Sequence, residues 1–356
     1  MPRTCIGLLG ILILVACAGG DRSPGAGRGE PPAEVPRGGD GRADRTAEDQ
    51  ARAGRSAAGE TRRFPPVEAE LRNVELESAA GILLRIRRLR GQLVPTRDGQ
   101  PPRFDDPTSF RLRVADAVVA IDAASLSVLI GQHVFGGDHP VRQVEIAIAD
   151  GRLVVEGNLR KGIPVPFHLE TRPRVAEGGG ILLEPDVLRA AGVPMKGLLD
   201  FFGLDLVEMM NADRARGIEV RDDRMILHPS GVLPPPRLDA RVTAVSVEGD
   251  LLVQRLGPPA TPQIEDELSS ESLESPLPDQ PNYQLFRGGV LRFGHLTMEP
   301  ADLMLVDADP GDPFRFSLAR YQRQLVGGYS KTLPDEGLVT IMPDADEAAG
   351  ADLAPR

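Results

Sequence analysis

The residue with the clearest chemistry in this sequence is Cys17, a thiol at the end of a short apolar segment. Arg3 supplies a positive charge ahead of residues 6–15, an apolar run interrupted only by glycines. The run is too short to span a bilayer as a permanent helix, and its length is typical of the hydrophobic region of a signal peptide. The small residue Ala16 leads directly into Cys17, so we expect export with a thiol at the cleavage site.

The segment Leu14-Val15-Ala16-Cys17 resembles the lipobox of bacterial lipoproteins. In that family the thiol receives a diacylglycerol, the peptide is cut before the cysteine, and the new amine is acylated. The resemblance therefore implies lipid attachment at Cys17 and a membrane partner reached through the anchor. The aspartate that usually retains lipoproteins at the inner membrane is absent after Cys17, which in a two-membrane bacterium favours the periplasmic face of the outer membrane. The alternative is an ordinary signal peptide with an incidental cysteine.

Other reactive groups do not form a recognisable catalytic or metal-binding pattern. The sequence lacks a GxSxG, an HExxH and a Gly-rich phosphate loop after a strand. Asp307, Asp309 and Asp312 look like part of a calcium loop, but an EF-hand needs glycine and glutamate where Asp312 and Leu318 stand. We therefore predict no enzyme activity, no metal and no cofactor. The histidines are scattered along the chain: His133, His139, His168, His228 and His295.

Low-complexity segments frame the part of the chain that we expect to fold. Residues 18–66 are rich in Gly, Pro, Ala and charged side chains, a composition that predicts a disordered tether. A flexible chain of this length has an r.m.s. span of roughly 35–42 Å. Residues 257–282 form an acidic loop by the same argument, and residues 344–356 form a disordered tail. The net charge of −11 makes nucleic acid an unsuitable partner.

Cysteine use agrees with a domain that depends on its core. The chain has two cysteines, and Cys5 would leave with the signal peptide. The mature protein would then begin with its only thiol and contain no internal disulfide. Residues 67–256 and the extension 283–343 are long enough to bury a core, and we expect the extension to pack on the main sheet because about 60 residues is marginal alone.

Strands are the dominant pattern between these segments. Alternating apolar residues predict strands at 82–94, 110–122, 141–150, 163–175, 241–248 and 251–256. Asp150-Gly151 and Gly249-Asp250 predict tight hairpin turns. Pro164 and Pro166 belong at an edge or a bulge. Long strands closed by tight turns favour an antiparallel, strongly curved sheet over βαβ units.

Two helices are predicted in the main domain and one in the extension. Asp122 is an N-cap for a helix over 123–134, and a third helix is expected at 314–326. Residues 195–210 combine an apolar stripe at helical spacing with further apolar residues beside it. A helix with this much apolar surface must either be buried in the core or contact an apolar ligand.

The order of elements from residue 122 to 256 resembles the LmeA-like phospholipid-binding proteins. The segments that carry it include VEIAIADGRLVVEGNL at 144–159, Gly180 to Pro185 and VTAVSVEGDLLVQRL at 242–256. The fold of that family is similar to TULIP-like and AsmA-like domains. The resemblance implies an α+β fold, with a long curved antiparallel sheet wrapped on one or two amphipathic helices. The acidic insertion and the C-terminal extension depart from the family, and no family binding residue can be transferred individually.

The 195–210 helix is the candidate wall of a lipid groove, because methionine and phenylalanine adapt to acyl chains. The alternative is that it is the central core helix. Arg85, Arg87, Arg88 and Arg90 would meet anionic headgroups, or form an ordinary solvated strand face. The candidate lipid-binding residues are Met195, Leu198, Leu199, Phe201, Phe202, Leu206 and Met209.

These observations predict an extracytoplasmic lipoprotein that binds phospholipid or another acyl lipid in an apolar groove, for envelope lipid transport or maintenance. The alternative function is a non-catalytic scaffold lipoprotein that binds another envelope protein.

Overall fold

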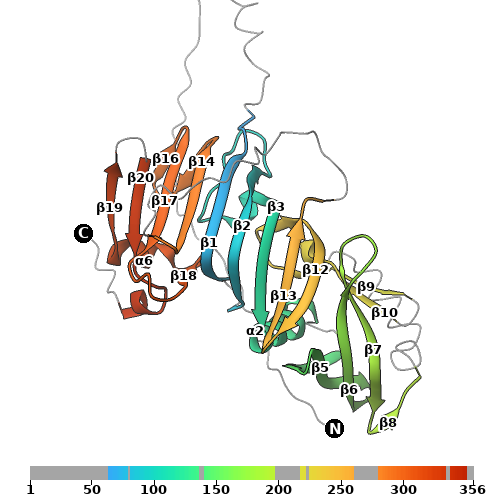
Figure 1. The fold of residues 1–356 in the computed structure, drawn as a ribbon. Helices are drawn as coiled ribbons and strands as arrows, with labels where there is room; N and C mark the ends of the chain where they lie inside the picture. Colours follow the sequence, from blue (N-terminus) through green and yellow to red (C-terminus); the bar gives the residue numbers. More distant parts are fainter. Residues whose placement is uncertain are drawn as a thin grey trace, which may run out of the picture. The chain divides into compact units, whose positions relative to one another are not determined.

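The computed structural model describes residues 63–78, 81–135, 140–196, 217–221, 224–259, 280–333 and 337–350. All of them belong to one compact unit, Thr61–Arg356. Within these ranges no helix is long and apolar enough to cross a membrane. The fold is mostly β, with large antiparallel and mixed sheets and few short helices (Figure 1).

The larger sheet has 11 strands and contains both ends of the described chain. β11 (Arg237–Asp239) joins β3 (Phe110–Asp122) in parallel, and β18 (Phe314–Ser317) joins β1 (Val67–Glu77) in parallel. Most other neighbours are antiparallel, except that β17 (Ala301–Asp307) and β20 (Gly337–Met342) run parallel. The main path of the sheet is β12 (Arg241–Glu248), β13 (Leu251–Gly257), β3 (Phe110–Asp122), β2 (Leu83–Pro95), β1 (Val67–Glu77), β14 (Tyr283–Gly288), β17 (Ala301–Asp307), β20 (Gly337–Met342) and β19 (Tyr329–Leu333).

The second sheet has seven strands and comes from the middle of the chain. β8 (Val193–Pro194) pairs with β7 outside the main path, and β15 (Leu291–Phe293) and β16 (Leu296–Met298) form a separate hairpin. The main path of this sheet is β4 (Val141–Ala149), β5 (Arg152–Lys161), β6 (Ile163–Val175), β7 (Ile181–Ala190), β10 (Arg224–Leu227) and β9 (Ile218–Arg221).

The tight turns lie where the sequence predicts them. Asp150 and Gly151 have φ of 53° and 73°, the left-handed pair of a type I′ turn, and Ala149 pairs with Arg152 across it. Gly249 has φ of 63° in the turn that joins Glu248 to Leu251. Both hairpin predictions are confirmed.

The helix at 123–134 is also confirmed. α2 (Ala123–Val128) continues into a π-helical turn (Leu129–Val134), and the Asp122 carboxylate accepts the Ser125 N–H at 2.7 Å as an N-cap. The other short helices are α5 (Pro229–Val232), α6 (Tyr321–Gly327) and 3-10 turns at Pro107–Ser109 and Glu347–Gly350.

The helix predicted at 314–326 is wrong over its first part. Phe314–Ser317 is the strand β18, and the helix α6 begins only at Tyr321. Phe314 and Phe316 are both fully buried while Arg315 between them is not, a period of two that belongs to a strand.

A single continuous antiparallel sheet is also a prediction that the structure corrects. Its strands are divided between two sheets, and the larger one includes parallel pairs. Over the described residues both sheets are open, since their strand orders end on β12 and β19 in one and on β4 and β9 in the other. Residues 283–288, as β14, pair with β1, so the C-terminal strands extend the larger sheet.

Candidate functional site

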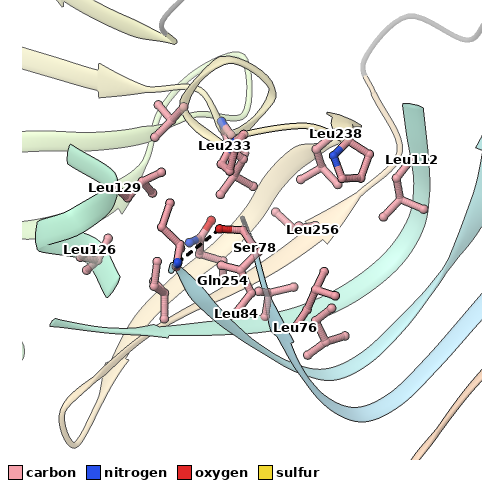
Figure 2. Close-up of a pocket in the computed structure, with 18 of the residues that line it drawn as sticks. Leu76, Ser78, Leu84, Leu112, Leu126, Leu129, Leu233, Leu238, Gln254 and Leu256 are labelled. Atoms are coloured by element: carbon pink, nitrogen blue, oxygen red, sulfur yellow. Dashed lines mark hydrogen bonds between the residues drawn. The ribbon is translucent and has the colours of Figure 1, made fainter. Parts of the chain in front are cut away.

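An apolar cavity of about 110 Å³ lies between the two sheets (Figure 2). β1, β2, β3 and β13 of the larger sheet supply one side. β7, β10, α2 and the turn after it supply the other. The residues that line it include Leu76, Leu84, Ile86, Leu112, Val119, Ile121, Leu126, Leu129, Ile181, Leu227, Leu233, Leu238, Leu252 and Leu256.

Strand alternation explains why one face of the larger sheet is apolar at this point. Leu84 pairs with Ile121, and Ile86 pairs with Val119. Residues two apart on a strand face the same side, so these four side chains form one apolar patch that lines the cavity. Arg85, between Leu84 and Ile86 on β2, points to the opposite face, where it contacts Glu75.

A proline-rich segment forms another wall. Pro229 and Val232 of α5 line the cavity, followed by Leu233 and the prolines at 234–236. Proline has no backbone N–H, so this segment presents fewer polar groups that need a partner than an ordinary loop would. The segment can therefore border an apolar space at low cost.

A smaller cavity of about 60 Å³ lies next to the first, on the inner face of the second sheet. Phe167 and Leu169 of β6 line it, with Leu153 and Val155 of β5. The side chains that line both cavities, and so form the partition between them, are Leu126, Ile130, Ile181, Leu227 and Leu252.

Polar side chains are rare around the larger cavity. Among the described residues that line it, Ser78 and Gln254 are the polar ones, and Figure 2 draws both. The Ser78 hydroxyl accepts the backbone N–H of Ile82 at 3.2 Å, the bond drawn dashed in the figure. Such a cavity can hold apolar matter and has polar contacts at few points.

Most of the sequence-predicted site lies outside the described residues: Cys17, Leu198, Leu199, Phe201, Phe202, Leu206 and Met209. Met195 is described. It follows β8, donates its N–H to the Leu188 carbonyl at 2.9 Å, and packs half-buried against the core without lining either cavity. The strand residues that line the cavity were not identified from the sequence. The one pattern that marks them in the sequence is the alternation of apolar and polar residues along each strand.

The arginines of β2 lie on the outer face of the larger sheet, paired with carboxylates. Arg85 contacts Glu75 at 3.1 Å, and Arg87 contacts Glu248 at 2.8 Å. Arg88 contacts Asp116 at 3.1 Å. These pairs fit the alternative of a solvated strand face and do not favour a headgroup site.

Within the described ranges, no group of three His, Cys, Asp or Glu side chains is arranged to hold a metal ion. Asp307 and Asp312, in the turn that resembles part of a calcium loop, lie near the carboxylate of Asp344 and repel its charge. Burial, and then the charges of Asp307, Asp312 and Asp346, raise the pKa of Asp344 to about 7. The Asp344 carboxylate accepts the Arg315 N–H at 2.7 Å.

The raised pKa of Asp344 predicts a pH-dependent stability. The folded state holds a proton that the unfolded state releases above its ordinary pKa of 3.8, so stability falls as pH rises from about 4 to about 7. Asp344→Asn keeps the acceptor without the charge. Allowing for solvent screening, we expect it to raise the free energy of unfolding by about 1–3 kcal/mol at pH 8 and little at pH 4, measured by denaturant titration.

Asp98→Asn is the matched control, because Asp98 is exposed in the turn after β2 and its change should be within about 0.5 kcal/mol at either pH. An equal gain from Asp344→Asn at pH 4 and pH 8 would contradict the predicted titration.

Comparison with known proteins returns no match: no family model, no curated protein and no solved structure matches the chain.

Proposed function

We propose that this chain is a non-catalytic lipoprotein, anchored through Cys17 on the periplasmic side of an envelope membrane, whose folded part holds an acyl chain in the cavity between the sheets. The observation that carries the proposal is the cavity wall, which is apolar on every side apart from Ser78 and Gln254 among the described residues. An acyl chain needs only such walls, and the two polar groups suit its ester or carboxyl end.

The volume limits what the cavity accepts. Apolar cavities of roughly 150 Å³ in protein cores stay dry and bind benzene-sized molecules. A cavity of about 110 Å³ therefore suits part of one chain. Rotation of the side chains between the cavities, such as Leu126 and Leu252, would join the second space of about 60 Å³ and accept a longer chain.

The proposal extends to the fold family. An LmeA-like, TULIP-like domain would explain the order of the hairpins and α2, and would make phospholipid the first ligand to test. In such a domain residues 195–210 would supply a further wall. Envelope lipid transport or maintenance is then the proposed role.

A scaffold lipoprotein that binds another envelope protein is the second candidate. β19 at one end of the larger sheet favours it, since this edge strand presents backbone groups and an exposed Tyr329 to a partner strand.

The test compares lipid bound to purified wild-type protein and to Leu233→Trp. The indole should occupy part of the cavity, so we expect acyl lipid in extracts of the wild type and several-fold less in the variant, measured by mass spectrometry against the amount of protein. Leu296→Trp, at an exposed position of β16, is the control and should retain the wild-type amount.

Thermal unfolding of Leu233→Trp must stay cooperative for the comparison to count. A wild-type protein that carries no lipid would rule out acyl binding and leave the scaffold function. Unchanged lipid in a folded Leu233→Trp would move the binding site away from this cavity.

A further inference from the structure

Two turns of the second sheet expose apolar side chains at the same end. Ile163 begins β6 and is 74% exposed, and Val193 lies in β8 and is 61% exposed. These are the highest values among the large apolar side chains that the structure describes. The Ala191 N–H donates to the Pro166 carbonyl at 2.8 Å, which ties the turn after β7 to the first residues of β6 (Figure 1, near β8).

Basic side chains lie within four residues of Ile163 and Val193 in the sequence, and the register places Arg160 opposite Pro164 and Arg189 opposite Pro194. Arg160, Arg189 and Lys196 are exposed, and none of them forms an ion pair with another described residue. Residues 159–168 and 187–196 contain no Asp or Glu, although the whole chain carries a net charge of −11. The hollow that Arg189 lines also contains Glu145 and Glu156, so basic side chains outnumber carboxylates at this end of the sheet without being the sole charges there.

The backbone at this end is poor in hydrogen-bond donors. β7 pairs with β6 only from Phe167 onward, so residues 163–166 have a strand neighbour on one side alone. Pro164 and Pro166 occupy this one-sided stretch, where proline leaves no donor unpaired. Because positions 164 and 166 have no backbone N–H, the strand can approach an apolar phase there without leaving a hydrogen-bond donor unsatisfied.

An apolar stripe leads from this end into the fold. Ile163, Val165, Phe167 and Leu169 share one face of β6 by alternation. Exposure falls along it from 74% at Ile163 to 8% at Phe167 and Leu169, and the last two line the smaller cavity. The end of the sheet thus presents apolar tips, a basic rim and a continuous apolar path to a cavity.

We propose that this membrane-docking tip, defined as Ile163, Val193, Arg160, Arg189 and Lys196, binds the surface of an anionic lipid bilayer. Ile163 and Val193 enter the boundary between headgroups and acyl chains, and the three basic side chains contact anionic headgroups. The two contributions, apolar insertion and attraction to anionic lipid, are those that hold interfacial segments on membranes. The proposal does not depend on a ligand in the cavity.

The absence of tryptophan from the chain allows a direct test. Val193→Trp places one reporter in the tip, and Val326→Trp places one at a position of matching exposure, 60%, on α6. The full-length protein is attached to vesicles of equal parts phosphatidylcholine and phosphatidylglycerol. We expect blue-shifted emission and quenching by brominated acyl chains for Val193→Trp, and neither for Val326→Trp.

Charge is tested in the Val193→Trp protein. Arg189→Gln with Lys196→Gln should lower the ratio of inserted to free reporter roughly tenfold or more. Arg323→Gln with Lys331→Gln removes the same charge from the C-terminal strands and helix and should leave the ratio unchanged. Vesicles of phosphatidylcholine alone should give little insertion.

Several outcomes would overturn the proposal. They are equal shifts for the two reporters, equal effects of the two double charge variants, and no shift at Val193→Trp with anionic vesicles. A shift that follows the density of protein on the vesicle, and not phosphatidylglycerol, would assign the tip to contact between protein copies.

Discussion

Phe104→Ala is expected to lower the free energy of unfolding by about 3–5 kcal/mol. Phe104 is buried in the loop between β2 and β3, and its ring lies 5.0 Å from that of Phe286 and 5.2 Å from that of Phe293. It also contacts the rings of Phe316 and Tyr321. The side chain joins elements that are far apart in the sequence, so its removal leaves a cavity that several strands border.

Backbone contacts limit how far this site can collapse after the change. The Phe104 N–H donates to the Arg292 carbonyl at 3.1 Å, and the Arg292 N–H donates to the Pro102 carbonyl at 2.9 Å. Equilibrium denaturation measures the effect. Tyr329→Ala removes a comparable but exposed ring and should change stability by less than about 1 kcal/mol. A loss below about 1 kcal/mol for Phe104→Ala would show that the aromatic cluster does not connect these elements.

Cys17→Ser is expected to abolish stable membrane attachment. Each buried methylene of an attached chain contributes ~0.8 kcal/mol, and stable anchoring takes more than one chain. A serine hydroxyl would not replace the thiol in lipid attachment. We expect the variant to be uncleaved or released, which fractionation after carbonate and salt washes and intact mass would detect.

Cys5→Ser is the matched control, because it removes the only other thiol of the chain. It should leave mass and fractionation of the mature protein unchanged. A Cys17→Ser protein that stays in washed membranes with normal mass would refute the anchor. Attachment that survives low salt but not the washes would instead be expected from the membrane-docking tip.

Local chemistry made several strands and both tight hairpins predictable. Asp150-Gly151 tolerates the two positive φ values that a two-residue turn requires, whatever surrounds it. Asp122 can cap a helix with its own carboxylate. The prolines of β6 were expected at an edge, and they lie where the strand has a neighbour on one side only.

The candidate site was less predictable because its walls are distant in the sequence. Leu76, Leu84, Ile121 and Leu252 meet only after β1, β2, β3 and β13 have paired. Alternation shows which side of a strand is apolar but not what that side will face. Residues 195–210 were selected from the sequence as the candidate site because they show the most apolar helical pattern, and the strand residues that line the cavity were not selected.

By itself, the sequence determined several of the strands, the two hairpin turns, the α2 cap and the apolar segment that ends at Cys17, because each depends on neighbouring residues. Tertiary structure decided the division into two sheets. Tertiary structure also decided the pairing within the larger sheet: on the side of β1 away from β2, the partner changes at Asn73, where φ is 49°, from β14 to β18, strands with over 20 residues between them. Pairing between distant strands depends on the packing of the whole core, so no local pattern encodes the cavity between the sheets.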